Sequence, residues 1–327
     1  MNESSPLEKI LSPIRQDLRA VERLVLDDLD TEIPLLTKVG HHILNSGGKR
    51  VRPALLLLSA GVVGKITERT RQAAKIIEYI HTATLLHDDV VDNADMRRSK
   101  SSARSIWGNE ASVLVGDYLF TVSFKYLSEF ENWKAMKSLS DATTQMARGE
   151  ILQLARSHET ATESDYLEVV FLKTASLMAA AMEIGAVLAG GGREQQKILY
   201  QCGTNIGIAF QLIDDALDYD LGNVEIGKPI GTDLKERKVT LPLSYLLQKA
   251  SPTHRSYVLD VLNGEEITDR HVEEVCALIE EYGSVRYTES RAERYVKTAN
   301  ELLEKLPDSK YRKGLRQLAE YIVSRRR

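Results

Sequence analysis

The sequence has few cysteines and few prolines, and each shortage excludes a class of structure. The two cysteines, Cys202 and Cys276, lie far apart and form neither a metal-binding cluster nor a disulfide framework. Such sparse use of cysteine fits a reducing compartment. Only eight prolines occur, and none lies between Ala54 and Lys228. Because proline interrupts helices, this stretch leaves room for many of them.

The sequence also lacks a basic surplus and a long apolar run. The net charge of -4 leaves no basic footprint, so we do not expect nucleic acid as a partner. Apolar runs such as ALLLLSAGVVG at 54–64 fall short of the roughly 20 residues that a membrane-spanning helix needs. The first residues, MNESSPLEKI, do not have the charged head and apolar stretch of a signal peptide. We therefore expect a soluble, cytoplasmic protein with no transmembrane segment.

What the sequence does contain is a strong helical pattern. Apolar residues make up 43% and charged residues 28%, a balance that supplies ample material for a core. From Leu167 to Leu188 apolar or small residues recur at the spacing of one helix face. Thr162 and Asp165 form a potential capping box at its start, and the glycines at 190–192 end it. Further helices are expected at 71–91, 112–129, 203–220 and within 269–327. Without a linker or repeat, the pattern predicts one all-α domain over residues 1–327.

Two acidic clusters interrupt this pattern at the ends of apolar helices. LLHDDVVDNADMRR at 85–98 and IDDALDYD at 213–220 share the spacing DDxxD. The first and last acids of each motif lie one helical turn apart, and like charges at that spacing repel. They also lie near helix C-termini, where the macrodipole disfavours anions. A single such run is best explained as a solvated acidic face, but two identical ones indicate a bound cation.

Oxygen-only carboxylate clusters suit hard cations. Mg²⁺ typically binds through carboxylates and substrate phosphates while keeping several waters. Two such clusters facing each other would hold several Mg²⁺ ions around one polyphosphate. On the same helix faces lie Gln211 and His81, although a lone histidine on an apolar helix is more often a core residue.

Basic groups accompany both clusters. GGKRVRP at 47–53 offers a flexible turn and three positive charges before an apolar helix, with Pro53 suited to its first position. Lys173 interrupts an apolar helix, where a lysine needs a partner. Other basic residues follow the clusters at 97–98, at 228 and at 235–238. Each alone fits a solvated surface, but together they predict a diphosphate bound by metal and side chains.

At this point the sequence resembles the trans-prenyl diphosphate synthases, in particular their bacterial long-chain branch. The resemblance rests on blocks that span most of the chain in family order: GGKRVRP (47–53), EYIHTATLLHDDVVDNADMRR (78–98), NEASVLVGDYLF (109–120), GEILQL (149–154), KTASL (173–177), FQLIDDALDY (210–219), GKPIGTDLKERKVTLP (227–242) and RAE (291–293). It implies an all-α, isoprenoid-synthase-type helical bundle around a deep central cavity, usually a homodimer. It also implies acidic clusters that face each other and bind three Mg²⁺ with an allylic diphosphate.

The resemblance also assigns roles by motif. The implied metal-binding acids are Asp88, Asp89, Asp92, Asp214, Asp215 and Asp218, with Asp88, Asp92 and Asp214 as the foremost direct ligands. The residues implied to bind the allylic diphosphate are Arg97, Lys173, Lys228 and Lys238. Those implied to bind isopentenyl diphosphate are Lys49, Arg52, His81 and Arg98. The implied catalytic residues are Lys173, Thr174 and Gln211, and the last two would direct oxygen dipoles at the developing cation.

The implied reaction is the Mg²⁺-dependent, head-to-tail (1'-4) addition of isopentenyl diphosphate to an allylic diphosphate such as farnesyl diphosphate. The allylic C–O bond ionises, the isopentenyl double bond attacks the cation, and a proton is lost to the released diphosphate. No serine, cysteine or histidine nucleophile is needed, and the sequence offers no such constellation. The metals would stabilise the departing diphosphate.

The implied product is long. The positions just before the first DDxxD, Ala83 and Thr84, are small, whereas bulky aromatics there block the tunnel of short-chain relatives. Tyr79 and Phe120 are candidates for a deeper floor or for ordinary packing. An octaprenyl-like product for quinone biosynthesis is the favoured expectation, with release of the lipid to a membrane. A geranylgeranyl product is the alternative.

The sequence departs from the family pattern at two positions, and rival functions remain open. Ser99 and Arg237 stand where the family commonly has glycine, close to the expected phosphate-binding positions. A terpene cyclase or head-to-head synthase is the nearest rival, but cyclases usually carry a different second motif and GGKRVRP favours elongation. The pattern is also compatible with a non-catalytic partner subunit of a heteromeric synthase, or with a plain helical scaffold.

Overall fold

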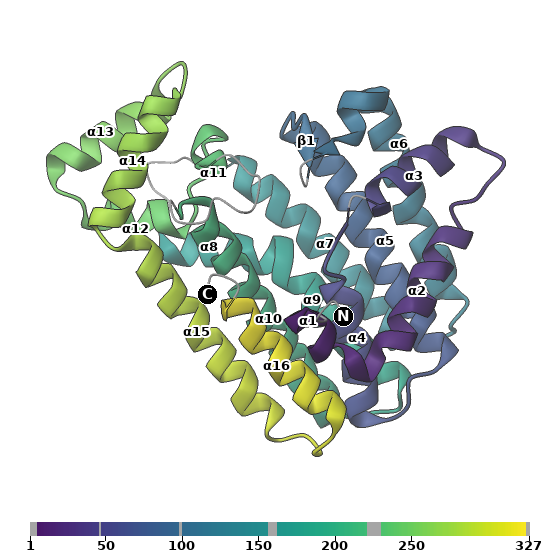
Figure 1. Cartoon of the computed structure of the whole chain (residues 1–327). Helices are drawn as coiled ribbons and strands as arrows, with labels where there is room; N and C mark the ends of the chain where they lie inside the picture. Colours follow the sequence, from purple (N-terminus) through teal and green to yellow (C-terminus); the bar gives the residue numbers. More distant parts are fainter. Residues whose placement is uncertain (1–4, 46, 98–99, 156–161, 221–229, 325–327) are drawn as a thin grey trace. The chain divides into compact units, whose positions relative to one another are not determined.

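The computed structural model describes residues 5–45, 47–97, 100–155, 162–220 and 230–324 (Figure 1). Within these ranges the regular structure is almost entirely helical, which confirms the all-α prediction. The exceptions are two short strands, β1 (Met96–Arg97) and β2 (Lys100–Ser101), which pair antiparallel with Met96 opposite Ser101.

The chain forms two compact units. The first contains Met1–Thr143, Leu177–Gly203 and Asn300–Leu318, and the second contains Thr144–Ser176, Thr204–Ala299 and Ala319–Arg327. Several long helices contribute residues to both units, so the division does not follow the order of the chain. The expectation of one domain over residues 1–327 stays a prediction.

The helices that lie wholly in the first unit come from the N-terminal part of the chain. They are α1 (Pro6–Ile10), a 3-10 turn (Ser12–Ile14), α2 (Arg15–Asp27), α3 (Pro34–Asn45), α4 (Val51–Val63), α5 (Glu68–Val91) and α6 (Ala103–Ser128). Helix α4 is buried along most of its length, because it is apolar on every side. Helix α9 approaches it closely at Gly185, where a Cβ atom would lie 2.3 Å from the Leu56 carbonyl oxygen. Only glycine fits there.

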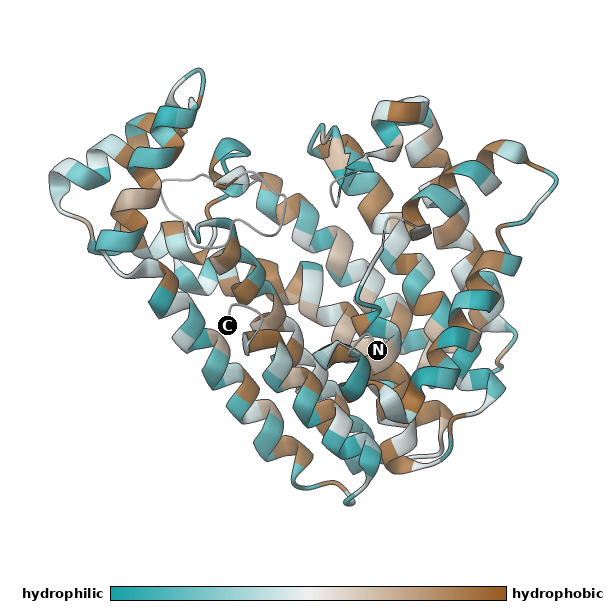
Figure 2. Ribbon diagram, in the orientation of Figure 1, coloured by the Kyte–Doolittle hydropathy of each residue, from teal (hydrophilic) through white to brown (hydrophobic). Residues whose placement is uncertain are grey.

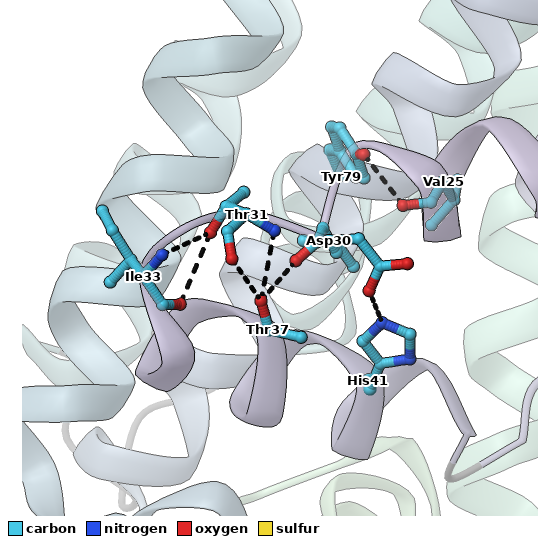
Figure 3. A network of polar contacts seen from close by, with 8 residues as sticks. Val25, Asp30, Thr31, Ile33, Thr37, His41 and Tyr79 are labelled. Carbon is cyan, nitrogen blue, oxygen red and sulfur yellow. Dashed lines mark hydrogen bonds and ion pairs between the residues drawn. The ribbon is translucent and has the colours of Figure 1, made fainter.

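The connection between α2 and α3 is fixed by polar contacts (Figure 3) as well as by the buried Leu29. The Thr37 hydroxyl donates to the Leu29 carbonyl oxygen at 2.8 Å and accepts from the Thr31 amide at 3.3 Å. The Tyr79 hydroxyl, from α5, donates to the Val25 carbonyl oxygen at 3.2 Å. Tyr79 is fully buried and contacts α2 through this bond, and the choice between its two predicted roles stays a prediction.

The helices that lie wholly in the second unit are α8 (Glu163–Val170), α11 (Thr232–Lys235), α12 (Leu241–Lys249), α13 (Pro252–Asn263) and α14 (Asp269–Glu281). Their apolar core includes Tyr219, Leu243, Val258 and Ile279. Five helices run through both units: α7 (Trp133–Ala155), α9 (Ser176–Leu188), α10 (Arg193–Asp218), α15 (Ser284–Leu303) and α16 (Lys310–Ser324). Teal and brown alternate along α15 in Figure 2, as expected of an amphipathic helix.

Most predicted helices are present with shifted ends. Helix α5 covers 71–91 as predicted, and the predicted capping box forms: the Asp165 amide donates to the Thr162 hydroxyl at 3.2 Å. Helix α10 begins ten residues before the predicted Gly203, and α6 extends back to Ala103 across a kink at Gly108, whose φ is +87°. Helix α4 begins at Val51 rather than at Pro53. Proline is tolerated there because amides of the first turn have no partner within the helix.

The predicted helix at 162–188 contains a wide turn. Residues Phe171–Ala175 form a π-helical segment between α8 and α9, and they carry Lys173 and Thr174. By length and composition Glu163–Leu188 could cross a membrane, but 78% of its most apolar window is buried within the protein. Core helices of globular proteins share these properties. π-helical turns are rare and often occur at functional sites.

Candidate active site

The first acidic cluster lies at the C-terminal end of α5. Asp88 and Asp92 are half-buried, one turn apart, whereas Asp89 is 1% exposed. Burial raises the pKa of Asp89, and the neighbouring Arg97 guanidinium partly offsets that rise. The two outer acids are therefore more exposed to solvent than Asp89.

Asp89 is held by a residue to which the sequence analysis assigned a different role. The Arg97 Nε donates to Asp89 Oδ1 at 2.5 Å, which ties β1 to the end of α5. The second oxygen of Asp89 is buried, and none of the residues that the structure describes forms a hydrogen bond with it. Arg97, expected to bind the diphosphate, and Asp89, expected to bind metal, thus form an ion pair with each other. Arg98, the other basic residue expected here, lies outside the described residues.

The GGKRVRP segment contacts α5 through two arginines. The Arg50 guanidinium donates to Glu78 Oε1 at 2.5 Å and to the Leu44 carbonyl oxygen at 3.1 Å. Arg52 Nη1 lies 3.2 Å from His81 Nε2. Because a guanidinium only donates, His81 accepts with Nε2, which requires the neutral tautomer protonated at Nδ1. Two residues expected to bind isopentenyl diphosphate are thereby brought together.

Lys49 and the small residues before DDxxD complete this part of the site. Lys49 is exposed, so an anion can reach it from solvent. Ala83 is fully buried, and the Thr84 hydroxyl donates to the His81 carbonyl oxygen at 2.8 Å. No large side chain stands at either position. Phe120 contacts Phe124 with ring centroids 5.4 Å apart, which fits ordinary packing.

The second acidic cluster, at the C-terminal end of α10, repeats the pattern of the first. Asp214 and Asp218 are half-buried, and Asp215 is buried at 5% exposure. Asp215 accepts from the Tyr166 hydroxyl at 2.5 Å and from Gln211 Nε2 at 2.7 Å. Burial raises the pKa of Asp215 to about 7, although both hydrogen bonds act to lower it. In both motifs the second aspartate therefore turns inward and is held by the protein.

Two expected catalytic residues belong to the same chain of hydrogen bonds. The Thr174 hydroxyl donates to Gln211 Oε1 at 2.8 Å, and Gln211 donates onward to Asp215. The proton of Thr174 is thus engaged, which leaves its oxygen lone pairs as the negative end of the dipole. The Gln211 oxygen accepts this bond.

Lys173 has the partners that a lysine in an apolar helix needs. Its Nζ lies 2.5 Å from Glu150 Oε2 and 2.6 Å from Gln153 Oε1, both on α7. Helix α7 comes this close because residue 149 is glycine: a Cβ atom there would lie 2.9 Å from the Lys173 backbone nitrogen. The GEILQL block thereby acquires a concrete role, which is to hold Lys173.

Beyond the second cluster the chain returns to it at α11. The Asp233 amide donates to Asp218 Oδ2 at 2.9 Å, and the Gly231 amide donates to the Asp218 carbonyl oxygen at 2.8 Å. Burial and the carboxylates of Asp218 and Asp215 raise the pKa of Asp233. Lys238 forms an ion pair with Glu236 at 2.9 Å. Lys228 lies outside the described residues.

Some residues of these networks were not identified from the sequence. Glu78, Glu150, Gln153 and Asp233 fall within the family blocks, which was a usable signal. Tyr166 had none, because a tyrosine in an apolar helix is ordinary. Only the fold shows which carboxylate or guanidinium each of them contacts.

The donor atoms fit a hard cation that shares its coordination with a substrate. Both clusters offer only carboxylate oxygens, and the outer acids of each are accessible. Across the described ranges, no three His, Cys, Asp or Glu side chains are close enough to hold a metal by themselves. Mg²⁺ commonly binds through one or two carboxylates together with phosphate oxygens and water. A pre-assembled protein cage is therefore not required, and the residues fit the ion.

Comparison with known proteins identifies the family. Residues 33–279 match the model of the polyprenyl synthetase family. The chain is 39% identical over 323 residues to the octaprenyl diphosphate synthase of Escherichia coli (strain K12), covering 98% of this chain and 99% of that protein. The structure is similar to that of a decaprenyl diphosphate synthase from Rhodobacter capsulatus, with TM-score 0.92, 38% identity, and 98% and 99% of the two chains covered.

A further similar structure is a polyprenyl synthase from Caulobacter crescentus CB15 complexed with calcium and isoprenyl diphosphate. Its TM-score is 0.94 at 36% identity, with both chains fully covered. The chain therefore belongs to the polyprenyl synthetase family. It is a prenyltransferase that makes a long-chain polyprenyl diphosphate, and its fold is that of the all-α isoprenoid synthases.

Proposed function

We propose that this enzyme adds isopentenyl diphosphate head-to-tail to an allylic diphosphate such as farnesyl diphosphate and stops at an octaprenyl-like length. The observation that carries the proposal is the repeated design of the two DDxxD motifs. In each, the first and last aspartates are accessible, while the middle one is buried and fixed by a hydrogen-bonding partner. This design supports metal ligands of defined direction at the ends of two helices.

Mg²⁺ is the cation we propose, with three ions bound together with the diphosphate. Asp88, Asp92 and Asp214 would be its foremost ligands, supported by Asp218, and the buried Asp89 and Asp215 would act mainly by fixing the helix ends. When bound, the ions supply the positive charge that stabilises a leaving diphosphate. Calcium is reported for the Caulobacter crescentus structure, which supports a divalent cation here.

The remaining proposed roles follow from the contacts of the side chains. Lys49, Arg52 and His81 would bind isopentenyl diphosphate, with Arg98 as a fourth. Because Arg52 occupies His81 Nε2, the histidine would donate to a phosphate through Nδ1.

Lys173 and Lys238 would bind the allylic diphosphate, each exchanging a carboxylate partner for a phosphate. Arg97 and Lys228 would assist them. Thr174, whose proton is committed to Gln211, would present its oxygen to the allylic cation. The released diphosphate would take the proton lost from the isopentenyl unit.

The length of the product is proposed from the small residues before the first DDxxD. Ala83 and Thr84 leave no bulky side chain on that part of α5. Named relatives differ in length, since one makes an octaprenyl and another a decaprenyl product. An octaprenyl-like product would serve quinone biosynthesis and be delivered from the cytoplasm to a membrane.

We also propose that the enzyme is a homodimer. Helix α6 exposes the large apolar side chains of Val113, Leu114 and Tyr118 at 37%, 64% and 38%, with Ile106 at 46% nearby. Exposed apolar groups on one helix support contact with another protein surface, and a second copy is the simplest partner. Sedimentation velocity of the purified chain tests this: a monomer at micromolar concentration would contradict it.

Product analysis tests the reaction and its length. Purified enzyme is incubated with Mg²⁺, labelled isopentenyl diphosphate and farnesyl diphosphate, and the dephosphorylated products are separated by reversed-phase chromatography. A ladder that ends at an eight-unit prenol is expected, with no products from Asp88→Ala. A ladder that ends at geranylgeraniol would contradict the proposed length alone. No incorporation with several allylic starters would favour a non-catalytic partner subunit.

A further inference from the structure

The segment before Lys238 carries an arginine where the backbone favours glycine. Helix α11 ends in a Schellman motif: the Arg237 amide donates to the Leu234 carbonyl oxygen at 2.9 Å, and the Lys238 amide donates to the Asp233 carbonyl oxygen at 2.8 Å. Arg237 occupies the left-handed position of this motif, with φ +56°. The family's preference for glycine is explained by that conformation, which side chains with a Cβ atom rarely adopt.

The side chain of Arg237 is engaged away from the expected phosphate site. Its guanidinium donates to the carbonyl oxygens of Leu262, Gly264 and Glu265, at 2.6 Å and 3.2 Å for the last two. The Leu262 carbonyl belongs to the last turn of α13 and the other two directly follow that helix, where a cation is favoured by the helix dipole. Arg237 therefore connects the turn that precedes Lys238 to the end of α13 by hydrogen bonds.

The same arrangement recurs independently in the other unit. Arg50 also has a left-handed backbone, with φ +47°, and it directly follows Lys49. Its guanidinium is engaged by Glu78, which is buried, and by the Leu44 carbonyl oxygen. In both places an arginine anchored to a distant element adjoins a lysine expected to bind a diphosphate.

We propose that Arg237 and Arg50 are positioning residues that fix the backbone beside Lys238 and Lys49, so that each lysine meets its diphosphate without first ordering its own segment. The proposal rests on the diphosphate-binding roles assigned above. A left-handed residue turns successive side chains in different directions, so the arginine and the neighbouring lysine point to different parts of the protein. Neither arginine touches substrate in this scheme.

Arg237→Gly removes the guanidinium that contacts α13 but keeps the left-handed backbone, because glycine adopts positive φ at no cost. We expect KM for the allylic substrate to rise three- to ten-fold, with KM for isopentenyl diphosphate and kcat within two-fold of wild type. Arg50→Lys, which keeps the charge beside Glu78, should raise KM for isopentenyl diphosphate instead. Arg270→Ala, which removes an exposed arginine from α14, should change neither. Wild-type KM values in Arg237→Gly would overturn the proposal.

A double-mutant cycle shows whether Arg237 acts through Lys238. If it does, Arg237→Gly adds no further loss to Lys238→Ala, whereas independent roles would make the losses multiply. Hydrogen exchange gives a readout that needs no turnover: the Lys238 amide should lose protection in Arg237→Gly and keep it in Arg270→Ala. Unchanged protection would contradict the anchor even if the enzyme elongates normally. A wild-type protein that fails to elongate, with protection lost as expected, would instead contradict the proposed function.

Discussion

The hydrogen bond from Tyr166 to Asp215 makes a measurable prediction about pH dependence. Asp215 is buried, its pKa is raised to about 7, and the Tyr166 hydroxyl stabilises its ionised form from 2.5 Å. The change to test is Tyr166→Phe, which removes the hydroxyl and keeps the ring in the core. The ionised Asp215 accepts the hydrogen bond of Gln211 and adds negative charge beside Asp214 and Asp218, the proposed metal ligands of this cluster, so a higher pKa of Asp215 moves the onset of activity to higher pH.

The size of the shift follows from the kind of hydrogen bond that is lost. A bond to a charged group contributes about 1.5–3 kcal/mol, and one pKa unit corresponds to about 1.4 kcal/mol. The pKa of Asp215 should therefore rise by about 1–2 units in Tyr166→Phe. At neutral pH the variant should lose on the order of 10-fold in activity at limiting Mg²⁺, because each unit of pKa lowers the ionised fraction of Asp215 by about that factor.

The assay is initial rate against pH, between about pH 6 and pH 9, at limiting and at saturating Mg²⁺. We expect the acid limb of the profile to move up by that amount and the rate at high pH to approach wild type. Tyr257→Phe is the matched control, since Tyr257 also donates to a carboxylate, that of Glu274, which has no proposed role in metal binding. An unshifted acid limb with a uniformly lower rate would refute the reasoning, because it would indicate a packing defect.

Three further predictions concern stability and binding. Asp28→Asn should lower the free energy of unfolding by about 2–4 kcal/mol in urea denaturation, because Lys75, whose side chain is 4% exposed, loses its partner at 2.6 Å. Arg52→Lys should raise KM for isopentenyl diphosphate on the order of 10-fold, because a lysine cannot hold the His81 tautomer and a phosphate together. The metal-free wild-type protein should lose stability as pH rises from about 4 to about 7, by up to about 1.4 kcal/mol per pH unit. In that range the folded Asp215 carboxyl, with its raised pKa, keeps its proton, whereas the unfolded one has released it. Asp215→Asn should remove this loss.

Each of these has a control and a contradicting outcome. Asp141→Asn removes an exposed ion pair with Lys137 at 2.7 Å and should lower the free energy of unfolding by under about 0.5 kcal/mol. An equally small loss in Asp28→Asn would show that the buried pair contributes no more than an exposed one. Arg104→Lys, outside the proposed ligands, should leave KM for isopentenyl diphosphate unchanged. Parallel stability–pH curves for wild type and Asp215→Asn would show that this carboxyl is not the titrating group.

The sequence predicted the helices well, because they follow from the spacing of apolar residues, and the same spacing places the first and last aspartates of each DDxxD on one helix face. The long apolar periodicity of α5 and the two DDxxD motifs, in each of which the first and last acids lie one turn apart, need no knowledge of tertiary contacts. The roles of the inner residues could not be predicted in this way. Asp89 and Asp88 are adjacent and chemically identical, and only packing shows that one contacts Arg97 while the other stays accessible. Spacing says which residues share a helix face, but not what lies opposite.

Arg237 illustrates the limit in another way. Its departure from glycine was visible in the sequence, and its proximity to Lys238 suggested an effect on phosphate affinity. That the guanidinium reaches the end of α13 depends on a contact between residues 25 or more positions apart. No local pattern encodes such a contact.

The wide turn at Phe171–Ala175 changes the direction in which the side chains after it point, relative to those before it. On a regular α-helix Tyr166 and Thr174, eight residues apart, would point about 80° from each other. If the π-turn absorbs one residue, the remaining seven bring them within about 20°, onto one side. That alignment agrees with the observation that both reach the Asp215 network on α10. Deleting one residue from this turn would leave an ordinary helix in which Tyr166 and Thr174 are seven residues apart and still aligned, so the turn accommodates an extra residue without changing the register of the site.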